Sequence, residues 1–145
     1  MAQTPHSAGF TLIELAITLA IVAVTTSFAV TTYRGHLLRS HRVEAAHALL
    51  GAAAEQEKFH LAHGYYGDRL DAIAGSEPPG LRTVSITAHG RFRLEVEWAD
   101  ASRYQILATA TDERSDPLCA RMSIDESGRR SALTASGEDS TAKCW

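Results

Sequence analysis

The pattern of hydrophobic and polar positions changes three times along the chain, and each stretch predicts a different element. From Phe10 to Val30 the side chains are predominantly apolar, and Glu14 is the only ionisable residue in that run. At about 1.5 Å rise per residue, a helix over this run is roughly 30 Å long, which matches the hydrocarbon core of a bilayer. We therefore expect residues 10–33 to form an apolar helix able to span a membrane.

The second stretch is one-sided and continues the helix without a proline. Apolar residues recur at the spacing of one helix face, and charged residues collect on the opposite side. We expect the helix that begins at Phe10 to end at about Ala62. Its rear half, assigned to residues 34–63, is expected to cover a globular domain. The predicted buried face consists of Val43, Ala46, Leu49, Leu50, Ala53 and Leu61.

The third stretch alternates with a period of two, which is typical of half-buried strands. Glycines and prolines separate it from the helix and predict a connecting loop over residues 64–80. Strands are expected at 84–88, 91–98, 104–110 and 120–124, so the sheet lies within 81–125. An antiparallel sheet with one apolar face must be covered, and the rear helix is the available cover. The fold class is therefore α+β, a long N-terminal helix packed on a four-stranded antiparallel sheet.

Charge and composition exclude several function classes. The net charge is −3, with 14 basic and 17 acidic residues, so no basic excess favours nucleic acid. Arg91 and Arg93 alternate with Glu95 and Glu97 along one polar strand face, which argues against a continuous DNA-binding stripe. A second basic group, Arg34, Arg39 and Arg42, either contacts lipid headgroups and anionic neighbours or forms a solvated patch.

The chain shows no recognisable catalytic constellation. It has seven histidines, and His60 and His63 are one helical turn apart, but no Cys, Asp or Glu at zinc-like spacing completes a metal site. A nucleophile elbow, a phosphate-binding glycine loop and a zinc-protease motif are also missing from the sequence. We expect a protein that is not an enzyme and that carries no metal or cofactor.

Residues 9–14, Gly-Phe-Thr-Leu-Ile-Glu, followed by about twenty mostly apolar residues, resemble the class III signal of type IV prepilins. The resemblance implies that residues 1–9 are a leader, that prepilin peptidase cleaves between Gly9 and Phe10, and that the new Phe10 amine is N-methylated. It also implies a filament-assembly role for Phe10 and Glu14, because an ammonium on one subunit attracts a neighbouring carboxylate strongly in a low-dielectric interior. The alternative is that Glu14 only extends to the headgroups near the helix start.

The two cysteines, Cys119 and Cys144, lie within the last 27 residues. In an exported domain an isolated pair predicts one disulfide, whereas free buried thiols are the alternative. The order of Cys119, a strand, Gly128 and Cys144-Trp145 resembles the disulfide-bounded region of type IV pilins, here residues 119–144. The strings Glu57-Lys58-Phe59-His60 and Gly64-Tyr65-Tyr66, together with the terminal Cys144-Trp145, most resemble PilE-type minor pilins.

The sequence departs from the family at two points. The leader has no Lys or Arg, and three arginines follow the apolar run, so the positive-inside rule alone would orient the helix the other way. We still expect the head, residues 34–145, in the periplasm, because a disulfide needs an oxidising compartment and the cleavage motif needs a cytoplasmic Gly9. Thr31 also stands where many pilins carry a helix-breaking proline.

The resemblance implies a minor pilin incorporated into a type IV pilus or its initiation and tip complex, supporting twitching motility, adhesion or DNA uptake. Implied partners are other major and minor pilin subunits, prepilin peptidase, an inner-membrane assembly platform and an assembly ATPase. The implied location is the bacterial inner membrane, single-pass, before assembly and the cell-surface pilus afterwards. Two alternatives stay open: a pseudopilin of a type II secretion system, and an uncleaved membrane-tethered domain that binds DNA or another ligand.

Overall fold

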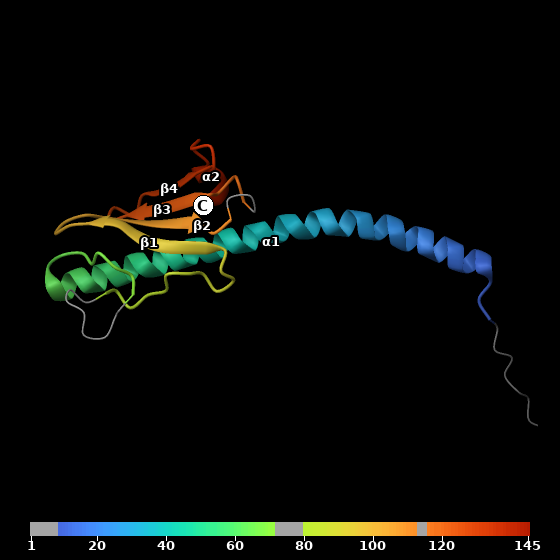
Figure 1. The fold of residues 1–145 in the computed structure, drawn as a ribbon, viewed down its shortest axis with the longest axis horizontal. Coiled ribbons are helices and arrows are strands. Elements are labelled where there is room, and N and C mark those ends of the chain that lie inside the picture. Colours follow the sequence, from blue (N-terminus) through green and yellow to red (C-terminus); the bar gives the residue numbers. More distant parts are fainter. Residues whose placement is uncertain (1–8, 72–79, 113–115) are drawn as a thin grey trace, which may run out of the picture. The chain divides into compact units, whose positions relative to one another are not determined.

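The computed structural model describes residues 9–71, 80–112 and 116–145. These residues form two compact units, of which the first ends at Leu37 and the second begins at Leu38. The elements follow in the order α1 (Leu12–His63), β1 (Phe92–Ala99), β2 (Tyr104–Ala110), β3 (Arg121–Asp125), β4 (Arg130–Leu133) and α2 (Thr141–Cys144) (Figure 1). The leader expected over residues 1–9 lies outside the described residues except for Gly9. The same holds for residues 72–79 of the expected connecting loop.

Helix α1 begins and ends where local signals place its ends. At the start, the Glu14 amide donates to Thr11 Oγ1 at 3.3 Å, so Thr11 caps the helix. At the end, Gly64 has a φ of +79°, and its amide donates to the His60 carbonyl at 2.8 Å. A glycine in this left-handed conformation is a common helix stop. The helix bounds are therefore close to the Phe10–Ala62 predicted from the hydrophobic pattern.

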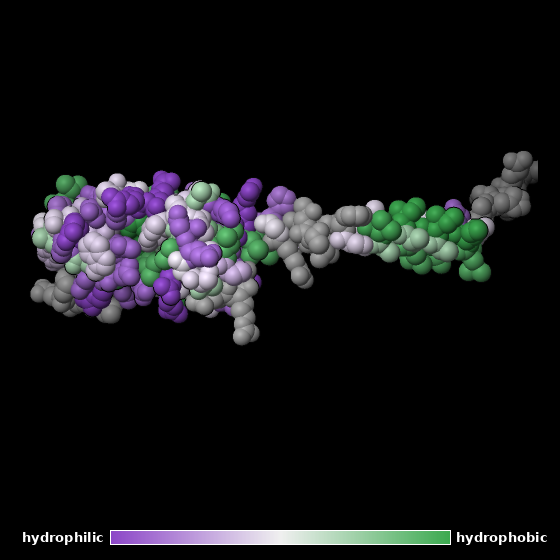
Figure 2. Space-filling model, turned by 90° about the horizontal axis from the view of Figure 1, so that it is seen from above, coloured by the Kyte–Doolittle hydropathy of each residue, from purple (hydrophilic) through white to green (hydrophobic). Residues whose placement is uncertain are grey.

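The first unit exposes a continuous apolar surface on the front of α1. Its large aliphatic side chains, from Leu12 through Val24, are more than half exposed, and Figure 2 shows apolar side chains gathered there. Among the described residues, however, no helix satisfies both the length and the hydropathy that a membrane span requires. The span expected within residues 10–33 is thus not confirmed.

In the second unit the four strands form one antiparallel sheet in the order β1-β2-β3-β4. The register pairs Leu94 with Ala108 and Ala108 with Met122, which places these apolar residues on one face. A bulge between Val96 and Trp98 shifts the register at the end of β1. Short connections join β1 to β2 and β3 to β4, as consecutive antiparallel strands allow, whereas residues 111–120 form a longer connection between β2 and β3.

The strand count is as expected, but one strand differs. The strand predicted over 84–88 is wrong: the structure has only an isolated bridge between Ile86 and Arg93 there. The fourth strand is instead β4, which the sequence pattern did not indicate because most of its side chains are exposed. The sheet therefore runs from residue 92 to residue 133, later than the 81–125 expected.

The buried face of α1 is also rotated from the predicted one. Leu49 is buried as expected, whereas Val43, Leu50 and Leu61 are exposed. Small alanines belong to the core on this face, and polar residues occupy two of its buried positions. The buried residues on this face of α1 are His41, Ala45, Leu49, Ala52, Gln56 and Phe59.

Candidate functional sites

The N-terminal segment presents the residues predicted for processing and assembly. Phe10 is 85% exposed and precedes the first turn of α1, where Glu14 is the acidic residue. Thr11 and Glu14 have the spacing of a capping box, and a carboxylate in the first turn is favoured by the helix dipole. Glu14 therefore has a local role at the helix start in addition to the role that the resemblance implies.

Hydroxyl groups inside the apolar segment are satisfied by the helix itself. Thr25 Oγ1 donates to the Ile21 carbonyl at 2.9 Å, and Ser27 Oγ donates to the Ala23 carbonyl at 2.6 Å. Such bonds occupy the hydroxyl donors of these two residues, and they tend to bend a helix slightly. These side chains are therefore compatible with apolar surroundings.

The C-terminal region is closed by a disulfide between Cys119 and Cys144, the pairing that the resemblance implies. The chain end is fastened as well, because Trp145 Nε1 donates to the Ser131 carbonyl at 2.9 Å. The Arg130 guanidinium lies 5.2 Å from the centre of the Trp145 ring, a cation–π distance. The disulfide thus ties α2 to the segment before β3, and the two Trp145 contacts tie the chain end to β4.

Arg42 forms an ion pair inside the head, which neither the lipid-contact nor the solvated-patch interpretation included. Its Nε lies 2.6 Å from Asp116 Oδ2 and its second guanidinium nitrogen 2.8 Å from Asp116 Oδ1. Asp116 is buried and also accepts a hydrogen bond from the Cys119 amide. Arg42 is therefore a structural ion-pair partner and is neither a lipid contact nor part of a solvated patch.

Two ionisable side chains of α1 lie close to a third one from a segment distant in the sequence. His41 and Glu44 lie one turn apart on the helix, and His89 comes from the turn before β1. Their ligand-type atoms all lie within 4.8 Å of one another. Partial burial alone would raise the pKa of Glu44, but hydrogen bonds from the side chain and backbone of His89 outweigh it and hold the pKa below its usual value.

His60 and His63, whose spacing in the sequence would suit a pair of metal ligands, do not belong to a metal-ligand cluster among the described residues. The His63 ring stacks on Phe59 at 4.1 Å between centroids, and the His60 ring stacks on Tyr66 at 4.4 Å. They pack against the aromatic residues that follow the helix. The His41, Glu44 and His89 cluster was missed because His89 is 45 residues from Glu44, and only the i, i+3 spacing of His41 and Glu44 was visible.

The exposed face of the sheet carries two arginines in one row. Arg93 pairs in register with Thr109, and Thr109 pairs with Arg121, so both guanidinium groups come from the same level of the sheet. Strands lie about 4.8 Å apart, which separates the two backbones by about 10 Å. Both side chains are exposed, and neither forms an ion pair with the described residues.

Comparison with known proteins gives two family matches. Residues 31–123 match the family described as type IV minor pilin ComP, DNA uptake sequence receptor, and residues 4–30 match the prokaryotic N-terminal methylation motif. Among solved structures, a type IV pilin from Shewanella oneidensis is similar at 23% identity, covering 63% of this chain and 88% of that one with a TM-score of 0.42. The search of curated proteins finds no match.

Proposed function

The chain belongs to the ComP family of type IV minor pilins, and from that premise we propose that it is the pilus subunit that binds DNA for uptake. The observation that carries the proposal is the match of residues 31–123 to a family described as a receptor for a DNA uptake sequence. DNA uptake is thus favoured over twitching motility and adhesion as the output of the pilus.

The row formed by Arg93 and Arg121 is the proposed phosphate contact. Phosphate contacts supply most of the affinity of proteins for DNA and position the protein on the duplex. Along β1 alone, Glu95 and Glu97 follow the arginines and interrupt a basic stripe. The register with β2 and β3 adds Arg121 at the level of Arg93, so the basic row runs across the strands.

Assembly of the subunit follows the N-terminal motif. We propose that prepilin peptidase cleaves after Gly9, that the Phe10 amine is methylated, and that Glu14 of one subunit pairs with the Phe10 ammonium of the next. The exposed apolar front of α1 then exchanges lipid for neighbouring helices, because large exposed apolar surfaces mark interaction sites. The assembly platform and ATPase of the inner membrane supply the work of extraction.

DNA binding is tested by titrating the full chain in detergent into fluorescent double-stranded DNA at several salt concentrations. We expect the Arg93→Gln/Arg121→Gln variant to bind DNA about tenfold more weakly. The slope of the logarithm of its association constant against the logarithm of salt concentration should become shallower by about two, since each phosphate contact contributes about 0.9 to that slope. Lys58→Gln is the matched control, because Lys58 is exposed but already pairs with Glu55 at 2.6 Å. An unchanged double variant would exclude this row, and a chain without DNA affinity would exclude the receptor role.

Two further measurements separate the alternatives. Mass spectrometry of the membrane-extracted chain should find methylated Phe10 as the first residue, whereas an intact leader would favour a tethered, uncleaved domain. Deletion of the gene should impair piliation and DNA uptake and leave type II secretion intact. Lost secretion with normal piliation would instead identify a pseudopilin.

A further inference from the structure

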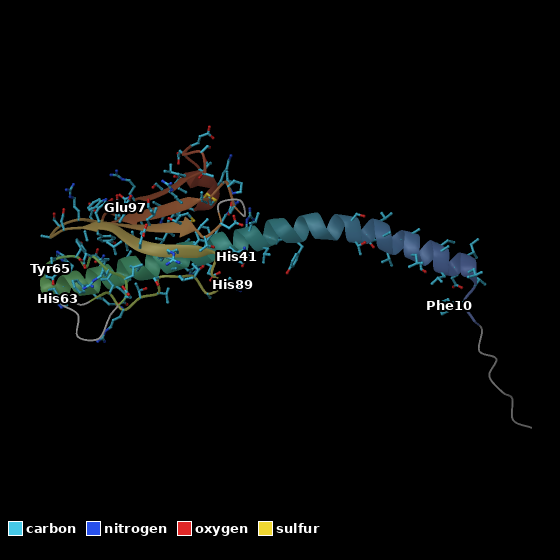
Figure 3. The ribbon with its side chains drawn as sticks, in the orientation of Figure 1. Phe10, His41, His63, Tyr65, His89 and Glu97 are labelled. Atoms are coloured by element: carbon cyan, nitrogen blue, oxygen red, sulfur yellow. A yellow bond between two sulfur atoms is a disulfide. The ribbon has the colours of Figure 1, made fainter. Side chains whose placement is uncertain are left out.

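The cluster of His41, Glu44 and His89 has a geometry that the pilin role does not use. The imidazoles of His41 on α1 and His89 on the turn before β1 are tilted against each other, with ring centroids 5.4 Å apart. Figure 3 labels both residues. The carboxylate of Glu44 lies with them. All three residues belong to the second compact unit.

The spacing of the three side chains suits a four-coordinate metal. Glu44 Oε2 lies 2.9 Å from His89 Nδ1 and 3.8 Å from His41 Nδ1. In a tetrahedral zinc site with bonds of about 2.0–2.1 Å, neighbouring ligand atoms are about 3.4 Å apart. The two distances bracket that value, and all three ligand-type atoms lie within 4.8 Å of one another, so a cation fits between them after rotation of the side chains.

His41 supplies an independent indication of a ligand. It is 9% exposed, and its Nδ1 is buried and has no hydrogen-bond partner among the described residues. A buried imidazole nitrogen without a partner loses its hydration without compensation. Because this nitrogen lies 3.8 Å from Glu44 Oε2 and its ring lies beside the His89 ring, a cation between the three groups would satisfy it.

The other two ligands are held in place by the backbone. Glu44 Oε1 accepts a hydrogen bond from the His89 amide at 3.0 Å, which leaves Oε2 directed at the imidazoles. The turn that carries His89 is closed by hydrogen bonds from the Gly90 amide to the Thr87 carbonyl and from the Phe92 amide to Thr87 Oγ1. Such outer contacts orient metal ligands and raise affinity.

We propose that His41, Glu44 and His89 form a binding site for a divalent transition metal of the zinc type, which fastens the turn before β1 to helix α1. Two imidazole nitrogens and one carboxylate oxygen are a ligand set that zinc accepts, whereas Ca²⁺ and Mg²⁺ prefer oxygen ligands alone. His89 is 69% exposed on its side chain, so a fourth position is open to water or to a donor from another molecule.

The test is calorimetric titration of Zn²⁺ alone into the full chain, purified in detergent without a histidine tag. We expect one equivalent to bind, and we expect His89→Ala and Glu44→Gln each to weaken binding at least about tenfold. Both residues lie outside the apolar core, so circular dichroism should show that these variants fold. His47→Ala is the matched control, since His47 is an exposed histidine of the same helix, and it should bind Zn²⁺ as the parent does.

Thermal unfolding gives a second readout. Zn²⁺ should raise the midpoint of the parent and of His47→Ala, a chelator should reverse the shift, and His89→Ala should not respond, because only binding to the folded state stabilises it. Equal Zn²⁺ affinity in parent, His89→Ala and Glu44→Gln would overturn the proposal, as would the lack of a saturable single equivalent. Ca²⁺ binding as tight as Zn²⁺ binding would overturn the assigned class of metal.

Discussion

Arg42 on α1 and Asp116 before β3 form a two-point ion pair across 74 residues of sequence. The Asp116 carboxylate also accepts a hydrogen bond from the Cys119 amide, so the ion pair ties the helix to the start of the disulfide-bounded region. Planar guanidinium and carboxylate groups match at two points, which makes such pairs both strong and directional. Little of the Asp116 side chain is exposed, so its charge depends on Arg42 for compensation.

Breaking this pair should destabilise the head. Arg42→Ala leaves a buried carboxylate unpaired, and we expect a loss of about 3 kcal/mol in the free energy of unfolding, measured by urea titration. Arg42→Lys should recover only part of the loss, because an ammonium cannot form the second parallel bond. Lys58→Ala removes an exposed ion pair and should change stability by less than about 1 kcal/mol. Equal losses in the free energy of unfolding for Arg42→Ala and Lys58→Ala would show that the buried pair contributes no more to stability than an exposed one.

The disulfide between Cys119 and Cys144 should contribute about 3 kcal/mol, since it closes a loop with a sequence separation of 25. The Cys119→Ser/Cys144→Ser variant should therefore unfold at lower urea than the parent. Reductant should shift the parent toward the variant and should leave the variant unchanged. A parent that is insensitive to reductant under conditions where the bond is shown to be open would contradict this expectation.

Substitutions at Glu14 separate charge pairing from helix capping. If Glu14 neutralises a neighbouring Phe10 ammonium, both Glu14→Ala and Glu14→Gln should prevent incorporation into sheared pili, measured by immunoblot, while the head stays folded. If Glu14 only caps the helix, Glu14→Gln should be incorporated normally, because Gln also suits that capping position. Glu97→Ala, an exposed carboxylate on β1, is the control and should be incorporated.

Stability should fall in acid through the turn after β3. Burial alone would raise the pKa of Asp125, but hydrogen bonds from Ser127 and Arg129 outweigh it and hold the pKa below its usual value. A carboxylate with a depressed pKa stabilises the fold above its unfolded value of about 3.9, and that contribution is lost as the pH falls through the lower folded value. Urea midpoints measured from about pH 6 to about pH 2.5 should therefore fall less in Asp125→Asn than in the parent.

Elements that depend on local periodicity could be predicted from the order of residues alone. The apolar run and the one-sided pattern after it placed helix α1 within two residues of its observed bounds. Strict alternation placed β1 and β2, because a half-buried strand shows its period in hydropathy regardless of its neighbours. The resemblance at residues 9–14 pointed to the type IV pilin family, because that motif is a short contiguous run that does not depend on the fold.

The contacts of each surface became known only from the folded chain. Gln56 is buried because its amide exchanges two hydrogen bonds with the backbone of Gly67, which hydropathy does not reveal. Leu61 is exposed although it is apolar, because the sheet covers the face centred on Ala45, Leu49 and Ala52. The Arg42–Asp116 pair and the meeting of His89 with Glu44 have the same origin. Burial and charge pairing are properties of contacts between distant residues, and those contacts exist only once the chain has folded.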